Sequence, residues 1–353
     1  MSTQDRSRKA LWLGRFLTAF IGIALGFATP AAQASLLFVA NPTTSSLEFF
    51  DASTGINVGG AILPGDGAYP IGVTLGPDGN IYVADNGMSA VDAYNGTTGA
   101  YIGQFIPSQN CGSGCPTSAL NQPSGLVFGP DGNLYVANYG NDGSGYINVY
   151  NGTNGAFMST FVGTAAGLSY PGGLAFDSNG NLYVANTNGG TIEEFNSSGA
   201  NIGPFVPAGN PPSPLAVPES IAFGPDGNVY VVDEGSGGYI DVFSAAGGYL
   251  GQFTGSSNPF FDGPVDLTFG PGGQLYVTYS MGVAVFQGTF SGGADPESAD
   301  LVSYPELNAP EFLAFGPAAE TAVPEPSTPA LLALGLLGLA GVRRLRRAPV
   351  SPQ

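Results

Sequence analysis

The chain has 353 residues, of which 26 are Asp or Glu, 8 are Lys or Arg and none is His. The absence of His excludes a Ser-His-Asp triad and an imidazole base. Residues 35–325 hold every acid except Asp5 and no Lys or Arg, so this acidic region excludes a lysine Schiff base and repels nucleic acid. The 56 Gly, 29 Pro and 43% apolar residues indicate many short strands and turns around a sizeable core.

Residues 1–34 have the organisation of a secretory signal peptide. Four basic residues precede the apolar run FLTAFIGIALGFA, namely Arg6, Arg8, Lys9 and Arg15. The small residues AQA at 32–34 then provide a cleavage site before Ser35. A membrane anchor is the alternative, but the run is shorter than the ~20 residues that a spanning helix needs. The sequence therefore predicts an exported chain.

The middle of the chain repeats a ten-residue pattern. Its copies are GPDGNIYVAD (76–85), GPDGNLYVAN (129–138), DSNGNLYVAN (177–186), GPDGNVYVVD (224–233) and GPGGQLYVTY (270–279). They recur about every 46–53 residues, which is the period of a β-propeller blade. Each unit is predicted to hold four strands, with an Asp-Gly turn between the first and the second.

The strand signatures also predict how the ring closes. A Pro-x-x-apolar first strand begins six times, at Pro70, Pro123, Pro171, Pro218, Pro264 and Pro310. A second strand also begins six times, at Leu37, Ile81, Leu134, Leu182, Val229 and Leu275. The second strand at Leu37 has no first strand before it in the chain. The first strand in the segment 310–317 has no second strand after it. Pairing the two predicts an all-β, six-bladed propeller over residues 35–320, closed by its C-terminal strand.

These units resemble the NHL family of propellers. The resemblance covers roughly residues 36–317 and rests on the Pro-x-Gly-apolar start, the Asp-Gly-Asn turn and the YVAD strand. NHL units often carry Arg before the third strand, where this chain has GGTIEEF (189–195) and GGYIDVF (237–243). The departure argues against the RNA binding that is known among NHL propellers.

Two cysteines, Cys111 and Cys115, lie in the stretch CGSGC. Export to an oxidising compartment favours a local disulfide between them. A zinc site is the alternative, but the stretch lacks further ligands. The predicted disulfide would close one loop.

Acidic residues are expected at the mouth of the central channel, where first strands begin and second strands end. Glu219, Asp266 and Glu311 follow the opening prolines of three consecutive units, and Asp233 ends a second strand. Such oxygen ligands suit Ca²⁺ or Mg²⁺. This set is similar to the metal site of the SMP-30/gluconolactonase family of six-bladed lactonases. The alternative is structural, because Asp or Asn at the end of a strand commonly binds loop amides.

Tyrosines fall into two groups. Those of the repeated strand (Tyr82, Tyr135, Tyr183, Tyr230, Tyr276) recur in register, which favours packing between blades over a carbohydrate platform. Aromatic residues in the irregular loops are better candidates for stacking on sugars, namely Tyr139, Tyr170, Phe260 and Phe261.

The C-terminal segment 321–353 has three parts in a fixed order. Pro324, Glu325 and Pro326 are followed by a Leu-rich stretch at 330–342 and then by Arg343, Arg344, Arg346 and Arg347. This order resembles the PEP-CTERM sorting signal. The resemblance implies transient membrane anchoring through a C-terminal helix and removal by an exosortase-type protease, in bacteria that build an extracellular polymer matrix.

Together these features predict a non-catalytic binding propeller that is exported, by way of an inner-membrane intermediate, to the cell surface or the extracellular polymer matrix. Its expected partners are extracellular polysaccharide or matrix proteins and the processing protease, with no nucleic acid and no catalytic residue. The alternative is a Ca²⁺- or Mg²⁺-dependent lactone hydrolase that uses the acids at the channel mouth.

Overall fold

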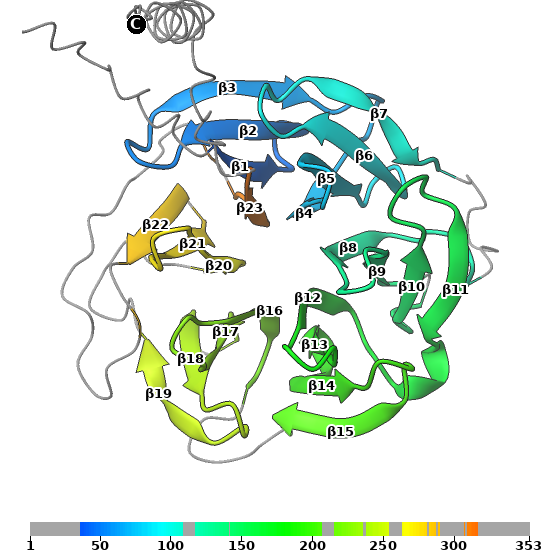
Figure 1. Ribbon diagram of the computed structural model, residues 1–353, viewed down its shortest axis with the longest axis vertical. Coiled ribbons are helices and arrows are strands. Elements are labelled where there is room, and N and C mark those ends of the chain that lie inside the picture. The colour runs from blue at the N-terminus through cyan, green and yellow to red at the C-terminus, as the bar shows by residue number, and fades with distance from the viewer. Residues whose placement is uncertain are drawn as a thin grey trace, which may run out of the picture. The chain divides into compact units, whose positions relative to one another are not determined.

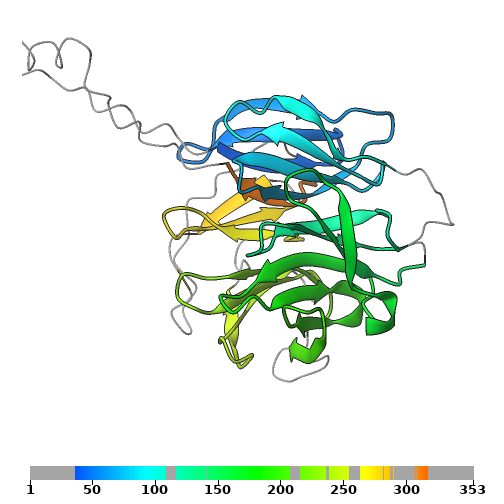
Figure 2. The ribbon, with the colours of Figure 1, turned by 45° about the vertical axis from the view of Figure 1, so that its right-hand side comes forward.

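In the computed structural model the described residues are 36–108, 117–140, 142–206, 215–235, 238–253, 263–280, 282–286, 289, 307 and 309–316. They fall within one compact unit, Ala34–Ala319. Six antiparallel sheets stand around a common axis, each with its first strand innermost (Figures 1 and 2). The fold is therefore the predicted all-β propeller with six blades.

Blades 2 to 6 take their strands in chain order from the axis outwards, whereas the innermost strand of blade 1 comes from the end of the propeller. Blade 1 consists of β23 (Leu313–Phe315), β1 (Leu36–Asn41), β2 (Ser46–Asp51) and β3 (Asn57–Ile62). Blade 2 consists of β4 (Pro70–Leu75), β5 (Asn80–Asp85), β6 (Ala90–Asn95) and β7 (Tyr101–Ile106). Blade 3 consists of β8 (Pro123–Phe128), β9 (Leu134–Asn138), β10 (Tyr146–Tyr150) and β11 (Phe157–Val162).

The second half repeats this plan. Blade 4 consists of β12 (Pro171–Phe176), β13 (Leu182–Asn186), β14 (Thr191–Phe195) and β15 (Asn201–Val206). Blade 5 consists of β16 (Pro218–Phe223), β17 (Val229–Asp233), β18 (Tyr239–Phe243) and β19 (Tyr249–Phe253). Within the described residues blade 6 has β20 (Leu267–Phe269), β21 (Leu275–Tyr279) and β22 (Gly282–Phe286). Short 3₁₀ turns occur at Thr164–Ala166 and Thr187–Gly189.

The ring is closed by strands from the two ends of the propeller. β23 pairs antiparallel with β1, with Val39 opposite Leu313 and Leu37 opposite Phe315. The pairing extends beyond the strand, because the amide of Glu311 donates to the carbonyl of Ala40 over 2.9 Å. Figure 1 shows β23 lying innermost beside β1. The predicted closure is confirmed.

The repeated tyrosine joins each blade to the next. Its ring meets the last phenylalanine of the following inner strand edge to face at 4.8–5.1 Å between centroids; the pairs are Tyr82–Phe128, Tyr135–Phe176, Tyr183–Phe223, Tyr230–Phe269 and Tyr276–Phe315. Such aromatic pairs contribute roughly 0.5–1.5 kcal/mol each beyond the area they bury. The prediction that these tyrosines pack between blades is confirmed.

Inner strands approach one another closely around the channel. A Cβ at Gly125 would run into the carbonyl oxygen of Gly172 on the next blade, so only glycine fits there. Hydroxyl groups bridge the same gaps, since Ser124 Oγ donates to Pro171 O over 2.6 Å and Thr187 Oγ1 donates to Pro218 O over 2.9 Å. The channel wall is therefore a ring of blades linked by hydrogen bonds.

Several predictions lie outside the described residues. They concern the signal peptide 1–34, the Cys111–Cys115 disulfide, Phe260 and Phe261, and the tail 321–353. No helix in the described part of the chain is long and apolar enough to cross a bilayer. The domain boundaries and the C-terminal helix stay predictions.

Candidate binding site at the channel mouth

Glu219 and Glu311 lie at the end of the channel where the inner strands begin. Glu219 is the second residue of β16, and Glu311 precedes β23, where its amide is fixed by β1. Both side chains are half-buried, and Glu219 feels the negative charges of Glu311 and Glu234. The structure thus brings together two acids that are far apart in the sequence, as the closure of the ring predicted.

The pKa values of both carboxyl groups are raised. Burial, followed by the charges of Glu234, Glu311 and Asp233, raises the pKa of Glu219 to about 8. Burial, followed by the charges of Glu234 and Asp266, raises the pKa of Glu311 to about 7. No Lys, Arg or His lies between Arg15 and Arg343 to offset these charges. Strong shifts of this kind mark candidate functional sites.

Tyrosine rings border the acidic pair. The pKa of Tyr139, which follows β9, is raised by burial and by the charges of Glu219 and Glu311. The pKa of Tyr69, which precedes β4, is raised by burial and by the charge of Glu311. Tyr139 and Tyr170 pair with ring centroids 5.2 Å apart. Since Tyr69 is 45% exposed and Tyr170 is 41% exposed, their rings are open to a ligand.

The backbone at Tyr170 is strained. Its φ is +50°, and it directly precedes Pro171, a combination that a bulky residue rarely adopts. The ring lies over Gly143, where a Cβ would come within 2.5 Å of Tyr170 Cε2 and clash with it. Gln122 and Ala309, which precede Pro123 and Pro310, have the same conformation (φ +51° and +52°), so it is a feature of the repeat and not of the mouth alone. Tyr170 and Tyr139 were expected from the sequence as sugar-stacking residues, whereas Tyr69 was not.

Asp233 binds the loop that leads into its own blade. Its Oδ1 accepts the amides of Val217 (2.7 Å) and Gly235 (3.1 Å), and its Oδ2 accepts the amide of Ala216 (2.9 Å). Asn138 and Asn186, at the same position of blades 3 and 4, also accept loop amides. The contacts of Asp233 are therefore those of the alternative interpretation, in which a strand-end Asp binds loop amides.

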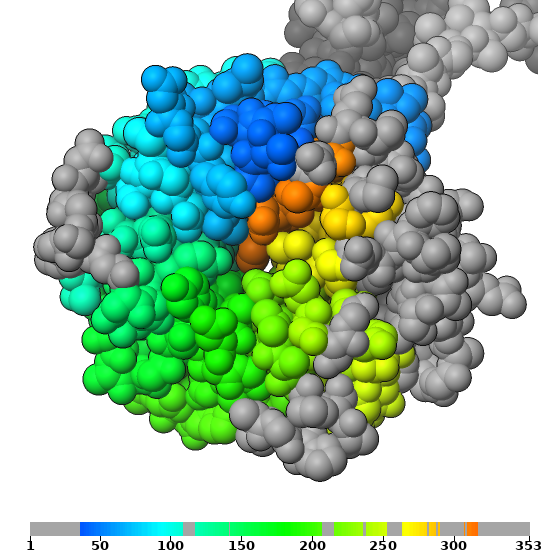
Figure 3. All heavy atoms as spheres, turned by 180° about the vertical axis from the view of Figure 1, so that it is seen from behind, coloured from blue at the N-terminus to red at the C-terminus, as the bar shows by residue number. Residues whose placement is uncertain are grey.

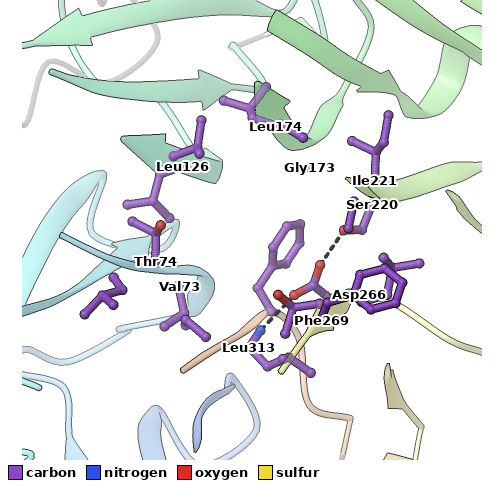
Figure 4. A pocket seen from close by; sticks show the side chains of 18 of the residues that line it. Val73, Thr74, Leu126, Gly173, Leu174, Ser220, Ile221, Asp266, Phe269 and Leu313 are labelled. Atoms are coloured by element: carbon purple, nitrogen blue, oxygen red, sulfur yellow. Dashed lines mark hydrogen bonds between the residues drawn. The ribbon is translucent and has the colours of Figure 1, made fainter. Parts of the chain in front are cut away.

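Asp266 lies in the channel wall and joins three blades. Ser220 Oγ of blade 5 donates to one carboxylate oxygen, and the amide of Leu313 of blade 1 donates to the other over 2.8 Å (Figure 4). The side chain is 4% exposed, and burial raises its pKa to about 6 against the opposing effect of these hydrogen bonds.

The channel itself is a cavity of about 450 Å³. Its lining comes from all six inner strands and is mostly aliphatic and aromatic, with Thr74, Ser220, Asp266 and Thr268 as polar side chains (Figure 4). In a space-filling view of one face, the blades meet around a narrow central opening bordered by the ring-closing residues (Figure 3). A ligand at the mouth would therefore rest over a narrow, mainly apolar shaft.

In the part of the chain that the structure describes, no three or more His, Cys, Asp or Glu side chains are arranged to hold a metal ion. Asp233 and Asp266 use their oxygens for protein donors, which leaves Glu219 and Glu311, with the exposed Glu234 whose charge acts on both, as the acids of the mouth. Metal binding by Glu219, Asp266, Glu311 and Asp233 stays a prediction.

Comparison with known families agrees with this architecture. The NHL repeat matches residues 68–92 and 168–195, and the PEP-CTERM protein-sorting motif matches residues 322–347. The chain is a six-bladed propeller that carries NHL repeats and a PEP-CTERM motif. The sorting motif of this NHL-repeat propeller indicates export to the cell surface or the extracellular space. No curated protein matches the sequence.

Solved structures share the fold of this NHL-repeat propeller at low sequence identity. A chain in the nidogen/laminin complex is 17% identical, with a TM-score of 0.61 over 81% of this chain and 99% of its own. A protein of unknown function from Bacteroides caccae is 12% identical, with a TM-score of 0.57 over 80% and 99%. A putative gluconolactonase is 19% identical, with a TM-score of 0.50 over 71% and 87%. At these identities the similarity shows the fold alone.

Proposed function

We propose that this propeller is a non-catalytic binding module of the cell surface or extracellular polymer matrix, and that its channel mouth binds polysaccharide. The observation that carries the proposal is the grouping of open tyrosine rings with two half-buried carboxyl groups at one end of the channel. Aromatic faces stack on the apolar faces of sugars, and carboxyl groups form hydrogen bonds with sugar hydroxyls.

The chemistry of the mouth supports binding rather than catalysis. The region between Arg15 and Arg343 has no His, Lys or Arg, so carboxylates are the side-chain bases available there near neutral pH. Asp266 and Asp233 are engaged by amides and a hydroxyl, which leaves them no open position toward a substrate. Glu219 and Glu311, with raised pKa values, carry protons for part of the time near neutral pH and then donate hydrogen bonds to a sugar.

Binding can be tested by co-sedimentation with the extracellular polymer purified from the producing cells. Tyr170→Ala removes one open ring and is expected to weaken retention at least several-fold, since a stacked ring is worth about 1 kcal/mol. Phe157→Ala is the matched control, because Phe157 is 40% exposed and also packs on a tyrosine, Tyr150, but lies on the outer strand β11. Equal retention of both variants and the parent protein would refute the mouth as the binding site.

The sorting motif supports transient anchoring and removal by an exosortase-type protease. Replacing Pro324, Glu325 and Pro326 by Ala is expected to hold the chain in the inner membrane at its unprocessed size. Fractionation with immunoblotting checks this, and normal release of the variant would contradict the assignment.

A second candidate function is a Ca²⁺- or Mg²⁺-dependent lactone hydrolase. It is favoured by one observation, the mutual repulsion of Glu219 and Glu311, which a divalent cation would relieve. The hydrolase should contain a stoichiometric ion and lose both the ion and lactone hydrolysis in the Glu219→Gln/Glu311→Gln variant. A purified protein that hydrolyses no lactone in the presence of either ion would exclude this candidate.

A further inference from the structure

Blade 2 buries two carboxyl groups on one face of its sheet. Asp85 ends β5, Asp92 lies within β6, and both are 0% exposed. The register pairs Asp85 with Ala90 and Val83 with Asp92. Paired residues, and residues two apart on one strand, point to the same face of a sheet. Asp85 and Asp92 are therefore diagonal neighbours on that face.

The shared face packs against blade 1 (Figure 1). Tyr94, two residues beyond Asp92, belongs to the same core cluster as Phe38 and Phe49 of blade 1. Tyr94 is itself 0% exposed. The two carboxyl groups and the Tyr94 hydroxyl thus lie between the two blades, away from bulk water.

Hydrogen bonds engage only one oxygen of each carboxyl group. Asp85 Oδ1 accepts the amides of Tyr69 (2.9 Å) and Met88 (3.0 Å), and Asp92 Oδ1 accepts the hydroxyl of Tyr101 (3.1 Å). Asp85 Oδ2, Asp92 Oδ2 and the Tyr94 hydroxyl are buried and have no hydrogen-bond partner among the described residues. Asn41 and Asn148, at the equivalent positions of blades 1 and 3, also have unpaired buried atoms, but only blade 2 has them on two carboxylates. Because an unpaired buried polar atom costs roughly 1–3 kcal/mol, the three atoms of blade 2 favour a ligand.

The protein has no cation of its own for this site. No Lys, Arg or His occurs between Arg15 and Arg343, so neither buried carboxylate can form a salt bridge with a side chain of that region. Burial, together with the charge of Asp85, raises the pKa of Asp92 to about 6 against the opposing effect of the hydrogen bond from Tyr101. At neutral pH Asp92 therefore still carries most of its negative charge, which a bound ion would neutralise.

We propose that a hard metal cation binds between blades 1 and 2 on Asp85 Oδ2 and Asp92 Oδ2. A divalent ion such as Ca²⁺ matches the charge of the two carboxylates. Carboxylate oxygens are the ligands that such ions prefer, and the Tyr94 hydroxyl oxygen is placed on the same face to join them. Two carboxylates balance one divalent ion. The ion would fasten blade 2 to blade 1.

Blade 5 provides an internal comparison. Asp233 and Asp241 occupy the positions of Asp85 and Asp92, and Tyr249 donates to Asp241 Oδ1 (3.3 Å) as Tyr101 does to Asp92. In blade 5, however, Asp233 accepts amides on both oxygens. The two blades therefore carry the same acids, but only the blade 2 pair leaves an oxygen of its strand-end carboxylate open.

The experiment is thermal unfolding of the purified exported protein after chelation, with Ca²⁺ added back and with parallel series in Mg²⁺ and Na⁺. We expect one bound ion per chain and a rise in Tm of about 5 °C at roughly 100 times the Kd for the preferred ion. Asp92→Asn should lose this response, whereas the matched variant Asp241→Asn should keep it. Asp85→Asn/Asp92→Asn should fold and be insensitive to the ion, because blade 3 accommodates Asn138 and Asn148 at these positions.

Two results would overturn the proposal. If the parent protein holds no ion and its Tm does not respond to any of the three cations, the open oxygens bind only water or a proton. If the response persists in Asp92→Asn and disappears in Glu219→Gln/Glu311→Gln, the ion lies at the channel mouth. The second result would support the hydrolase and leave blade 2 without a metal site.

Discussion

Replacing Glu219 by Gln is expected to stabilise the fold at neutral and alkaline pH, although Glu219 belongs to the candidate binding site. Burial and three neighbouring acids raise its pKa from 4.5 to about 8. Between these values the folded state binds more protons than the unfolded state, so stability falls as the pH rises. Glutamine resembles the protonated form and does not carry this cost.

The magnitude follows from the shift. With a pKa of 4.5 in the unfolded chain and about 8 in the fold, the charged form costs up to about 4 kcal/mol at about pH 7.5. This value is an upper bound, because a half-buried carboxyl group keeps some hydration. Even half of it would raise Tm by several degrees in a domain of this size.

The assay is urea unfolding followed by circular dichroism at about pH 4 and about pH 8. The gain in the free energy of unfolding of Glu219→Gln should be large at the higher pH and close to zero at the lower pH. Asp142→Asn is the control, since Asp142 is exposed and the amide of Ser144 (3.0 Å) helps to lower its pKa, so its neutralisation should bring no gain. A Glu219→Gln variant no more stable than the parent at about pH 8 would refute the reasoning.

Three further predictions concern the ring. Asp266→Ala should lower the free energy of unfolding by about 2–4 kcal/mol, since two buried donors lose their acceptor, whereas Asp266→Asn should lose less; denaturant titration compares them. Gly125→Ala should cost about 1–3 kcal/mol, and Gly163→Ala, where a Cβ meets nothing, should be neutral in the same titration. Deleting residues 309–316 leaves the inner edge of β1 unpaired, and size-exclusion chromatography should then show aggregates instead of monomers.

The repeat predicted the fold because its two signatures identify the first and the second strand of each blade. Pro70 and Pro310 begin equivalent segments, and counting such starts against the YVAD strands gave the number of blades and the closure. The tyrosine of each YVAD strand was also interpretable, since only packing between blades requires the same ring at every repeat.

The site was less predictable, since it depends on hydrogen bonds that no repeat encodes. Glu219 and Glu311 could be placed together once the ring was closed, but the roles of Asp233 and Asp266 depend on which loop amides reach them. Tyr69 was not predicted because most opening prolines follow other residue types. Its position directly before Pro70 matches that of Tyr170 before Pro171, and this match could have identified it. The open oxygens of Asp85 and Asp92 become visible only when their neighbours are known.

The order of synthesis gives the ring closure a consequence for maturation. The innermost strand of blade 1 is the last described segment of the chain, and the sorting motif starts at residue 322, a few residues after it. Until β23 has been synthesised, the inner edge of β1 lacks the strand that pairs with it in the finished propeller, even if the other blades have folded. The propeller is therefore completed only after its last strand has been synthesised, and the sorting motif is the next part of the chain to be made.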